Sequence, residues 1–321
     1  MQLFSYRCPQ ITRLLPVLIC GFFTFLSLPA VAADDSAQKD VAAQQMLARL
    51  WQSSRQTNYQ GVFTYQQGSQ LDSFRVTHWV EDGKEFESLS RLDGNEQVFI
   101  RPGNPLHCKR MGETLLAQSE QMESLYKVIH QGQERVAGRI ADKLRLQPRD
   151  FARNGYRLWL DSDTGLVLKA EVFSRHKGGS LLERFQFIDL SIGSDFSPLP
   201  DSEQSGVERL PVDLLPCDGE QTIDLGRWQI DQPPKGFVLS NVRQQEGGEK
   251  LLYSDGMASF SVFIEPAQKA TADCHGFRGA TVLCVSYLRD SQQRLYSVSV
   301  VGEIPMPLAK RLVRSVSEVA P

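Results

Sequence analysis

The chain has 321 residues and a formal net charge of −3 at pH 7, with 23% charged and 41% hydrophobic residues. This is the composition of an ordinary globular protein, and the length suggests one large or two medium domains. Because nucleic-acid-binding proteins are usually basic, with clustered lysine and arginine, the near balance of charge argues against a nucleic-acid partner.

The first 32 residues have the pattern of a secretory signal peptide. Arg7 and Arg13 precede an apolar stretch, and Ala30-Val31-Ala32 forms a cleavage pattern of small residues. An uncleaved anchor helix is the alternative, but the apolar stretch is short and ends in these small residues. We therefore expect residues 1–32 to be removed and the mature chain to be exported to the periplasm.

Two segments between residues 33 and 195 have the apolar spacing of a helix that packs on one face. The first carries Ala43, Met46, Leu47, Leu50 and Trp51, and the second carries Met122, Leu125, Tyr126 and Ile129. Each set follows an i, i+3, i+4, i+7 pattern, so we predict one helix around residues 43–51 and another around 122–129.

The rest of this region reads as short strands separated by turn signals such as Asp82-Gly83. The predicted strands cover 59–67, 73–80, 86–92, 97–101, 136–146, 156–161, 166–173 and 181–192. Some are apolar on both faces, whereas antiparallel sheets usually have one face in water. The sheet is therefore either covered by helices or wrapped around a hydrophobic cavity, and a helix packed on a sheet without a cavity has equal weight.

We predict a large, curled, antiparallel half-barrel sheet covered by helices for residues 33–195. Its apolar strand positions are the candidate lipid-binding residues, which are Phe63, Tyr65, Phe74, Val76, Phe185 and Phe187. Since an acyl chain contributes about 0.8 kcal/mol per buried CH₂ group, a lipid tail in such a cavity would bind with useful affinity.

A linker and a smaller α+β domain complete the chain. Residues 196–219 contain Pro198, Pro200, Pro211 and Pro216 among polar residues, which is typical of a domain boundary. In residues 220–321, strands are predicted at 227–230, 236–244, 250–254, 257–265, 280–288 and 294–301, with a loop through 274–276. A closing helix is predicted at 307–317. The fold class is thus α+β.

The cysteines and histidines lack the spacing of a metal site, so no metal and no cofactor are expected. Four cysteines follow the predicted signal peptide: Cys108, Cys217, Cys274 and Cys284. In an exported protein the short separation of Cys274 and Cys284 allows a disulfide between them, and four reduced thiols are the alternative.

Catalytic motifs are absent from the sequence, which has no G-x-S-x-G elbow, P-loop, G-x-G-x-x-G or H-E-x-x-H. This favours a binding protein over an enzyme. Basic clusters such as Arg175-His176-Lys177 would suit an anionic head group or an acidic peptide, although a solvated face is the simpler interpretation.

Several short stretches occur in an order that is typical of one family. They are Val136-Ala137-Gly138-Arg139, Pro148-Arg149-Asp150, Tyr156–Asp161 with Thr164-Gly165-Leu166, Tyr253-Ser254-Asp255-Gly256, Phe260–Phe263, Arg278-Gly279-Ala280 and Val300–Pro305. With the signal peptide and two domains, they resemble the RseB/MucB family of periplasmic regulators over essentially the whole mature chain.

The resemblance implies a large domain similar to the LolA/LolB lipoprotein carriers. It implies a small domain that binds the periplasmic part of a transmembrane anti-sigma factor and shields it from site-1 proteolysis. Lipid or lipopolysaccharide is then the signal for release, and in the MucB branch the output includes alginate synthesis.

We therefore interpret the chain as a non-enzymatic negative regulator of an envelope-stress sigma-factor pathway. A periplasmic lipid or lipoprotein carrier is the alternative, although a simple carrier needs no second domain. Arg278, Gly279 and Ala280 are the candidate partner-binding residues; the simpler interpretation is a solvated arginine beside a backbone bulge. The sequence leaves a homo-oligomer open.

Overall fold

The computed structural model describes residues 35–94, 97–105, 122–175, 179–193, 207–209, 226–245, 247–271 and 274–319. Ser36–Pro321 form one compact unit, and the description below concerns this unit. The predicted signal peptide and most of the predicted linker lie outside the described residues. Within them, no helix has both the length and the apolar character needed to cross a membrane.

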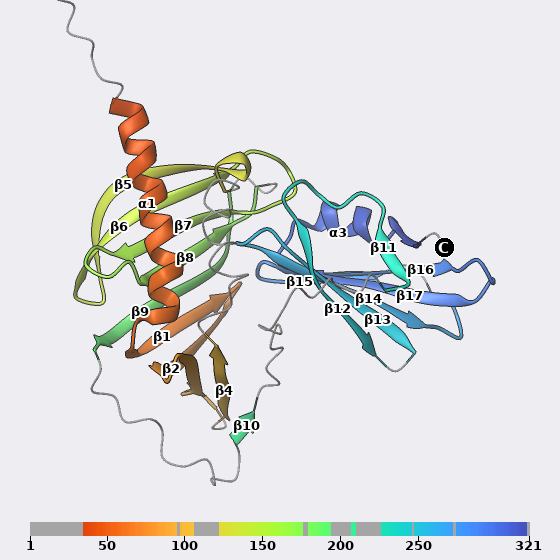
Figure 1. Ribbon diagram of the computed structural model, residues 1–321, viewed down its shortest axis with the longest axis horizontal. Helices are drawn as coiled ribbons and strands as arrows, with labels where there is room; N and C mark the ends of the chain where they lie inside the picture. Colours follow the sequence, from red (N-terminus) through yellow and green to blue (C-terminus); the bar gives the residue numbers. More distant parts are fainter. Residues whose placement is uncertain are drawn as a thin grey trace, which may run out of the picture. The chain divides into compact units, whose positions relative to one another are not determined.

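Ten strands form one large sheet (Figure 1). They are β1 (Tyr59–Gln67), β2 (Gln70–Glu81), β3 (Lys84–Arg91), β4 (Gln97–Pro105), β5 (Tyr126–Val136), β6 (Arg139–Pro148), β7 (Gly155–Asp161), β8 (Val167–Phe173), β9 (Leu181–Ile192) and β10 (Val207–Arg209). Their order is β10-β4-β3-β2-β1-β9-β8-β7-β6-β5. All neighbours are antiparallel except β10 and β4, which are parallel.

The sheet is open, because β10 and β5 end it and do not pair with each other. Hairpins join most neighbours, and the pairing of β1 with β9 connects the first half of the sheet to the second. The prediction of a large, mainly antiparallel sheet is confirmed.

Helix α1 (Asp35–Gln56) packs on this sheet. It buries Leu47 and Leu50 against an apolar cluster from β5, β6 and β7 that includes Leu144 and Leu158. The apolar spacing that predicted this helix supplies these contacts, because residues at i and i+3 lie on one side of a helix. Figure 1 shows α1 crossing the strands of the large sheet.

The second predicted helix is wrong beyond its first turn. Among the described residues, 122–125 are helical, and Tyr126 begins strand β5. Tyr126 and Val128 are buried and alternate with exposed Lys127, the period of a strand. The predicted strand 136–146 is also wrong at its start, since Ala137 and Gly138 have φ of 48° and 78° and form the turn between β5 and β6.

A smaller sheet follows, with the order β12-β13-β14-β17-β16-β15. Its strands are β12 (Val238–Gln245), β13 (Gly248–Ser254), β14 (Ser259–Pro266), β15 (Cys274–Arg278), β16 (Thr281–Arg289) and β17 (Leu295–Gly302), all antiparallel. Buried residues of its strands, such as Phe260, Val262 and Val298, form a separate core. The loop predicted through 274–276 is instead the edge strand β15, which pairs with β16.

The predicted closing helix at 307–317 is wrong in its second half. Helix α3 (Met306–Leu312) ends early, and β18 (Val316–Glu318) pairs with β11 (Trp228–Ile230). The apolar residues of that segment are nevertheless buried: Leu308, Leu312, Val313 and Val316 all join the core of the small sheet. A backbone turn at Ser315, whose N–H donates to the Leu312 carbonyl, separates the helix from the strand.

Candidate functional site

The six predicted lipid-binding residues lie together on one face of the large sheet. Cross-strand register pairs Phe63 with Phe74 on β2 and with Phe187 on β9, and it pairs Tyr65 with Phe185. Ring centroids of Phe63 lie 5.3 Å from Phe74 and 4.7 Å from Phe185. Val76 pairs with Gly61 on the same face. We call Phe63, Phe74, Phe185 and Phe187 the aromatic cluster.

The aromatic cluster continues the face on which α1 packs. Phe185 pairs with Ala170 of β8, and Ala170 contacts the buried cluster that contains Leu47 and Leu50 of α1. The aromatic residues themselves belong to no buried cluster of the described residues, and only Phe187 among the four is fully buried. Phe63, Phe74 and Phe185 therefore keep accessible apolar surface.

Glu183 of β9 forms a polar end to this face. The Tyr65 hydroxyl donates to Glu183 Oε2 at 2.7 Å, and Gln67 Nε2 donates to Oε1 at 3.0 Å. The side chain of Glu183 is buried, so these bonds replace the water it has lost. Burial, followed by the Glu183 carboxylate, raises the pKa of Tyr65, which therefore remains a neutral donor.

The predicted partner-binding residues meet this same polar end. The backbone N–H of Ala280 donates to Glu183 Oε1 at 2.8 Å, and Arg278 Nη2 donates to the side-chain oxygen of Gln70 at 2.7 Å. Ala280 is 1% exposed, and Gly279 lies so close to Glu183 that an added Cβ would collide with it. The turn between β15 and β16 therefore packs on the large sheet.

A buried ion pair joins the same two sheets at a second point. Arg153, in the loop after β6, is 0% exposed and its Nε donates to Asp255 Oδ2 at 2.8 Å. Its Nη2 donates to the backbone oxygen of Lys235 at 2.7 Å, and its Nη1 donates to Asp150. The guanidinium also lies 5.1 Å from the ring centroid of Phe237. Asp255, Lys235 and Phe237 each lie more than 80 residues away from this arginine along the chain.

Glu303 adds a second carboxylate near Glu183. Burial, followed by the negative charge of Glu183, raises the pKa of Glu303. A carboxyl group whose pKa is raised in the folded state stabilises that state while it is protonated. This contribution is lost as pH rises through the pKa of the folded state. The contact between the sheets thus contains an acid whose contribution to stability falls as pH rises.

The predicted disulfide stays a prediction. Cys284 is buried on β16, where its register partner is His275, while Cys274 pairs with Val285. The side chain of Cys274 lies outside the described residues, as do Cys108 and Cys217. No group of three or more potential metal ligands occurs in the described part of the chain.

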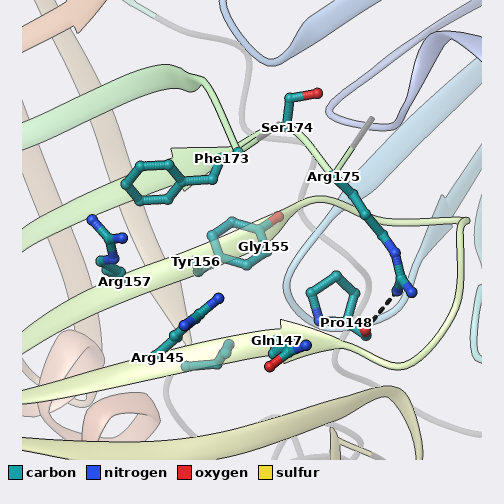
Figure 2. Close-up of a pocket in the computed structure, with 11 residues that line it drawn as sticks. Arg145, Gln147, Pro148, Gly155, Tyr156, Arg157, Phe173, Ser174 and Arg175 are labelled. Carbon is teal, nitrogen blue, oxygen red and sulfur yellow. Dashed lines mark hydrogen bonds between the residues drawn. The ribbon is translucent and has the colours of Figure 1, made fainter. Parts of the chain in front are cut away.

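A pocket of about 340 Å³ lies at the ends of β6, β7 and β8. Figure 2 shows Arg145, Arg157 and Arg175 around it, with Phe173 on one side and Gly155 on β7 between them. Arg175 Nη1 donates to the Pro148 carbonyl at 2.6 Å, which holds this side chain along the pocket wall. The basic cluster around Arg175 is visible in the sequence, but its proximity to Arg145 and Arg157 is not.

Sequence reasoning also missed Arg153 and Glu183. Both are charged residues that a sequence alone places at the surface, and their partners lie 102 and 97 residues away along the chain. A local signal exists only for Asp255, whose Oδ1 accepts hydrogen bonds from the N–H groups of Met257 and Ala258 in the turn Asp255-Gly256.

Comparisons with known proteins give one consistent result. The MucB/RseB N-terminal domain matches residues 42–207, and the MucB/RseB C-terminal domain matches residues 222–317. The chain is 36% identical over 309 residues to the sigma factor AlgU regulatory protein MucB of Pseudomonas aeruginosa, which covers 90% of this chain and 94% of that protein. It is 27% identical over 314 residues to the sigma-E factor regulatory protein RseB of Haemophilus influenzae, covering 92% and 97%.

A solved structure agrees with these relatives. The crystal structure of MucB in complex with MucA(peri) aligns with a TM-score of 0.69 and 31% identity, over 87% of this chain and all of that one. The relatives are named as regulatory proteins and not as enzymes, which confirms the prediction of a non-enzymatic chain. With both domain models matched and a relative more than 30% identical over most of its length, the chain belongs to the MucB/RseB family, as its sequence motifs predicted.

Proposed function

We propose that this protein is a negative regulator of an envelope-stress sigma factor. It binds the periplasmic part of a membrane-bound anti-sigma factor, shields that segment from site-1 proteolysis and leaves it when lipid or lipopolysaccharide binds. The observation that carries the proposal is the match to MucB, whose crystal structure in complex with MucA(peri) aligns with 87% of this chain.

The domain organisation and location follow from the same proposal. Residues 1–32 serve as a signal peptide, 33–195 as the lipid-binding domain, 196–219 as the linker and 220–321 as the partner-binding domain. The mature protein acts in the periplasm, where the anti-sigma segment is exposed. In the MucB branch of the family this regulation controls alginate synthesis. The relative in Pseudomonas aeruginosa is named as a regulatory protein of the sigma factor AlgU.

Partner binding is the first expected result. The mature chain should be retained by an immobilised periplasmic segment of the anti-sigma factor from the same organism, and it should slow cleavage of that segment by the site-1 protease. Pull-down and a timed digestion measure the two effects. If the chain binds lipid but neither binds nor protects the segment, the alternative of a lipid or lipoprotein carrier is correct instead.

The lipid site of this proposal is the aromatic cluster. Phe63, Phe74 and Phe185 expose apolar surface beside the region covered by α1. In this proposal the sheet acts as a half-barrel that holds the lipid on the face of α1. Burying such surface against an acyl chain is favourable by about 25 cal/mol per Å². The neutral Tyr65 and the carboxylate of Glu183 lie at the end of the cluster and set the boundary of the apolar region.

Lipid binding should therefore depend on the cluster face of β9. We expect Phe185→Ser to weaken binding of a fluorescent fatty acid at least tenfold, because a hydroxymethyl group replaces an aromatic ring in contact with Phe63 and Phe187. Ile188→Ser is the matched control, since Ile188 lies on the same strand and is 57% exposed outside the cluster. Equal affinities of the two variants would place the lipid elsewhere.

A further inference from the structure

The arginine pocket lies on the opposite face of the large sheet from the aromatic cluster. Arg145 and Arg157 alternate along their strands with Leu144 and Leu158, which pack towards α1. Successive side chains of a strand point to opposite faces, so the two arginines point away from α1. The pocket is thus a site distinct from the proposed lipid face.

Positive charge is concentrated there without matching negative charge. Arg145 and Arg157 are direct cross-strand partners, and like charges in that position destabilise a sheet. The Arg145 side chain makes no hydrogen bond or ion pair with any described residue, and the described lining of the pocket contains no acidic side chain.

The nearest carboxylate is already shared. Glu171 lies 3.6 Å from Arg157, but it also lies 3.2 Å from Lys169 and 2.9 Å from Arg184. One carboxylate is therefore shared by three cations on this face. Arg157 makes its closest aromatic contact with Phe173, whose ring centroid is 4.2 Å away, and this contact holds the guanidinium over the pocket.

Residue 155, at the floor of the pocket, is a glycine. Gly155 pairs with Phe173 and forms the floor between the arginines. A Cβ at this position would come no closer than 3.5 Å to its neighbours, an ordinary contact. Neither space nor backbone conformation requires a glycine here, and the missing side chain leaves room over the floor of the pocket.

We propose that this pocket binds a phosphate monoester, with the phosphoryl oxygens between Arg145 and Arg157 and the rest of the molecule over Gly155. Guanidinium groups bind such oxyanions through paired N–H donors, and the added negative charge relieves the repulsion between the two arginines. Phe173 offers a flat apolar wall to the organic part of the ester. The proposal does not rest on the regulatory function proposed above.

Three probes, measured by calorimetry on the mature chain, test this site and identify the source of the phosphate. They are inorganic phosphate, glucose 6-phosphate, and vesicles of phosphatidylcholine with or without phosphatidic acid. Tightest binding of glucose 6-phosphate assigns the pocket to soluble phosphate esters, and tightest binding of the phosphatidic acid vesicles assigns it to a lipid head group. Either result supports the proposal, and affinity should fall as salt is raised.

The variants locate the binding. Arg145→Gln should weaken the tightest probe at least tenfold, and so should Gly155→Val, which fills the floor with a side chain suited to a strand. Arg135→Gln is the matched control, because Arg135 is exposed on β5 of the same sheet and does not line the pocket. Urea midpoints confirm that each variant folds. Absence of binding by all three probes overturns the proposal, as does equal affinity of the Arg145→Gln variant and the control.

Discussion

Replacing Arg153 by methionine is expected to lower the free energy of unfolding by about 3–5 kcal/mol, the cost of removing one partner of a buried ion pair. The substitution leaves the Asp255 carboxylate without its cation in a place where neither residue is exposed to solvent. It also leaves the Lys235 carbonyl without its donor. The pair joins the loop after β6 to the turn between β13 and β14, so its loss also weakens the contact between the two sheets.

Urea denaturation of the mature chain measures this effect. Arg149→Met is the matched control, since Arg149 belongs to the same loop but is exposed, and its side chain donates to the backbone oxygen of Glu123 alone among the described residues. The double variant Arg153→Met/Asp255→Asn should recover part of the loss, because no unpaired charge remains buried. A cost below about 1 kcal/mol for Arg153→Met, the range of exposed ion pairs, would show that water reaches the pair.

The extent to which the sequence predicted the fold depended on the length of each pattern. The alternation of Phe74, Val76 and His78 placed these residues on one face of β2, and the register confirms it. Short apolar runs were ambiguous. Met122, Leu125, Tyr126 and Ile129 fit a helix by spacing, yet all but the first turn is strand, because pairing of β5 with β6 outweighs a weak local preference.

The candidate sites show a similar division. The aromatic cluster was predictable from the alternation of side chains within each strand. When β1, β2 and β9 pair, this alternation places Phe63, Phe74 and Phe185 on one face. The contacts of Arg153 and Glu183 were not predictable, because they join residues about a hundred positions apart and depend on how the two sheets pack against each other. The arginine pocket needed the register of β6 with β7, which no single strand reveals.

Gly279→Ala is expected to lower stability and to separate the turn between β15 and β16 from the large sheet. Gly279 has φ of +59°, where a Cβ costs roughly 1–2 kcal/mol, and the new methyl group would also collide with Glu183 and Gln67. The hydrogen bond from the Ala280 N–H to Glu183 would then be lost. Gly276→Ala is the matched control on the same edge strand, since its Cβ would meet nothing within 4 Å.

The same pair of variants separates two accounts of release. If lipid acts through the contact between the sheets, lipid and the anti-sigma segment should weaken each other's binding by one common factor, typically about 5–150-fold. Glu183 connects the lipid face to the turn, because it accepts from Tyr65 on one side and from Ala280 on the other. Gly279→Ala should therefore bring that factor close to one, while Gly276→Ala leaves it unchanged; titrations of each ligand with and without the other measure it. If lipid and segment instead compete directly for one surface, separating the turn from Glu183 does not remove the competition, and the factor stays the same in both variants.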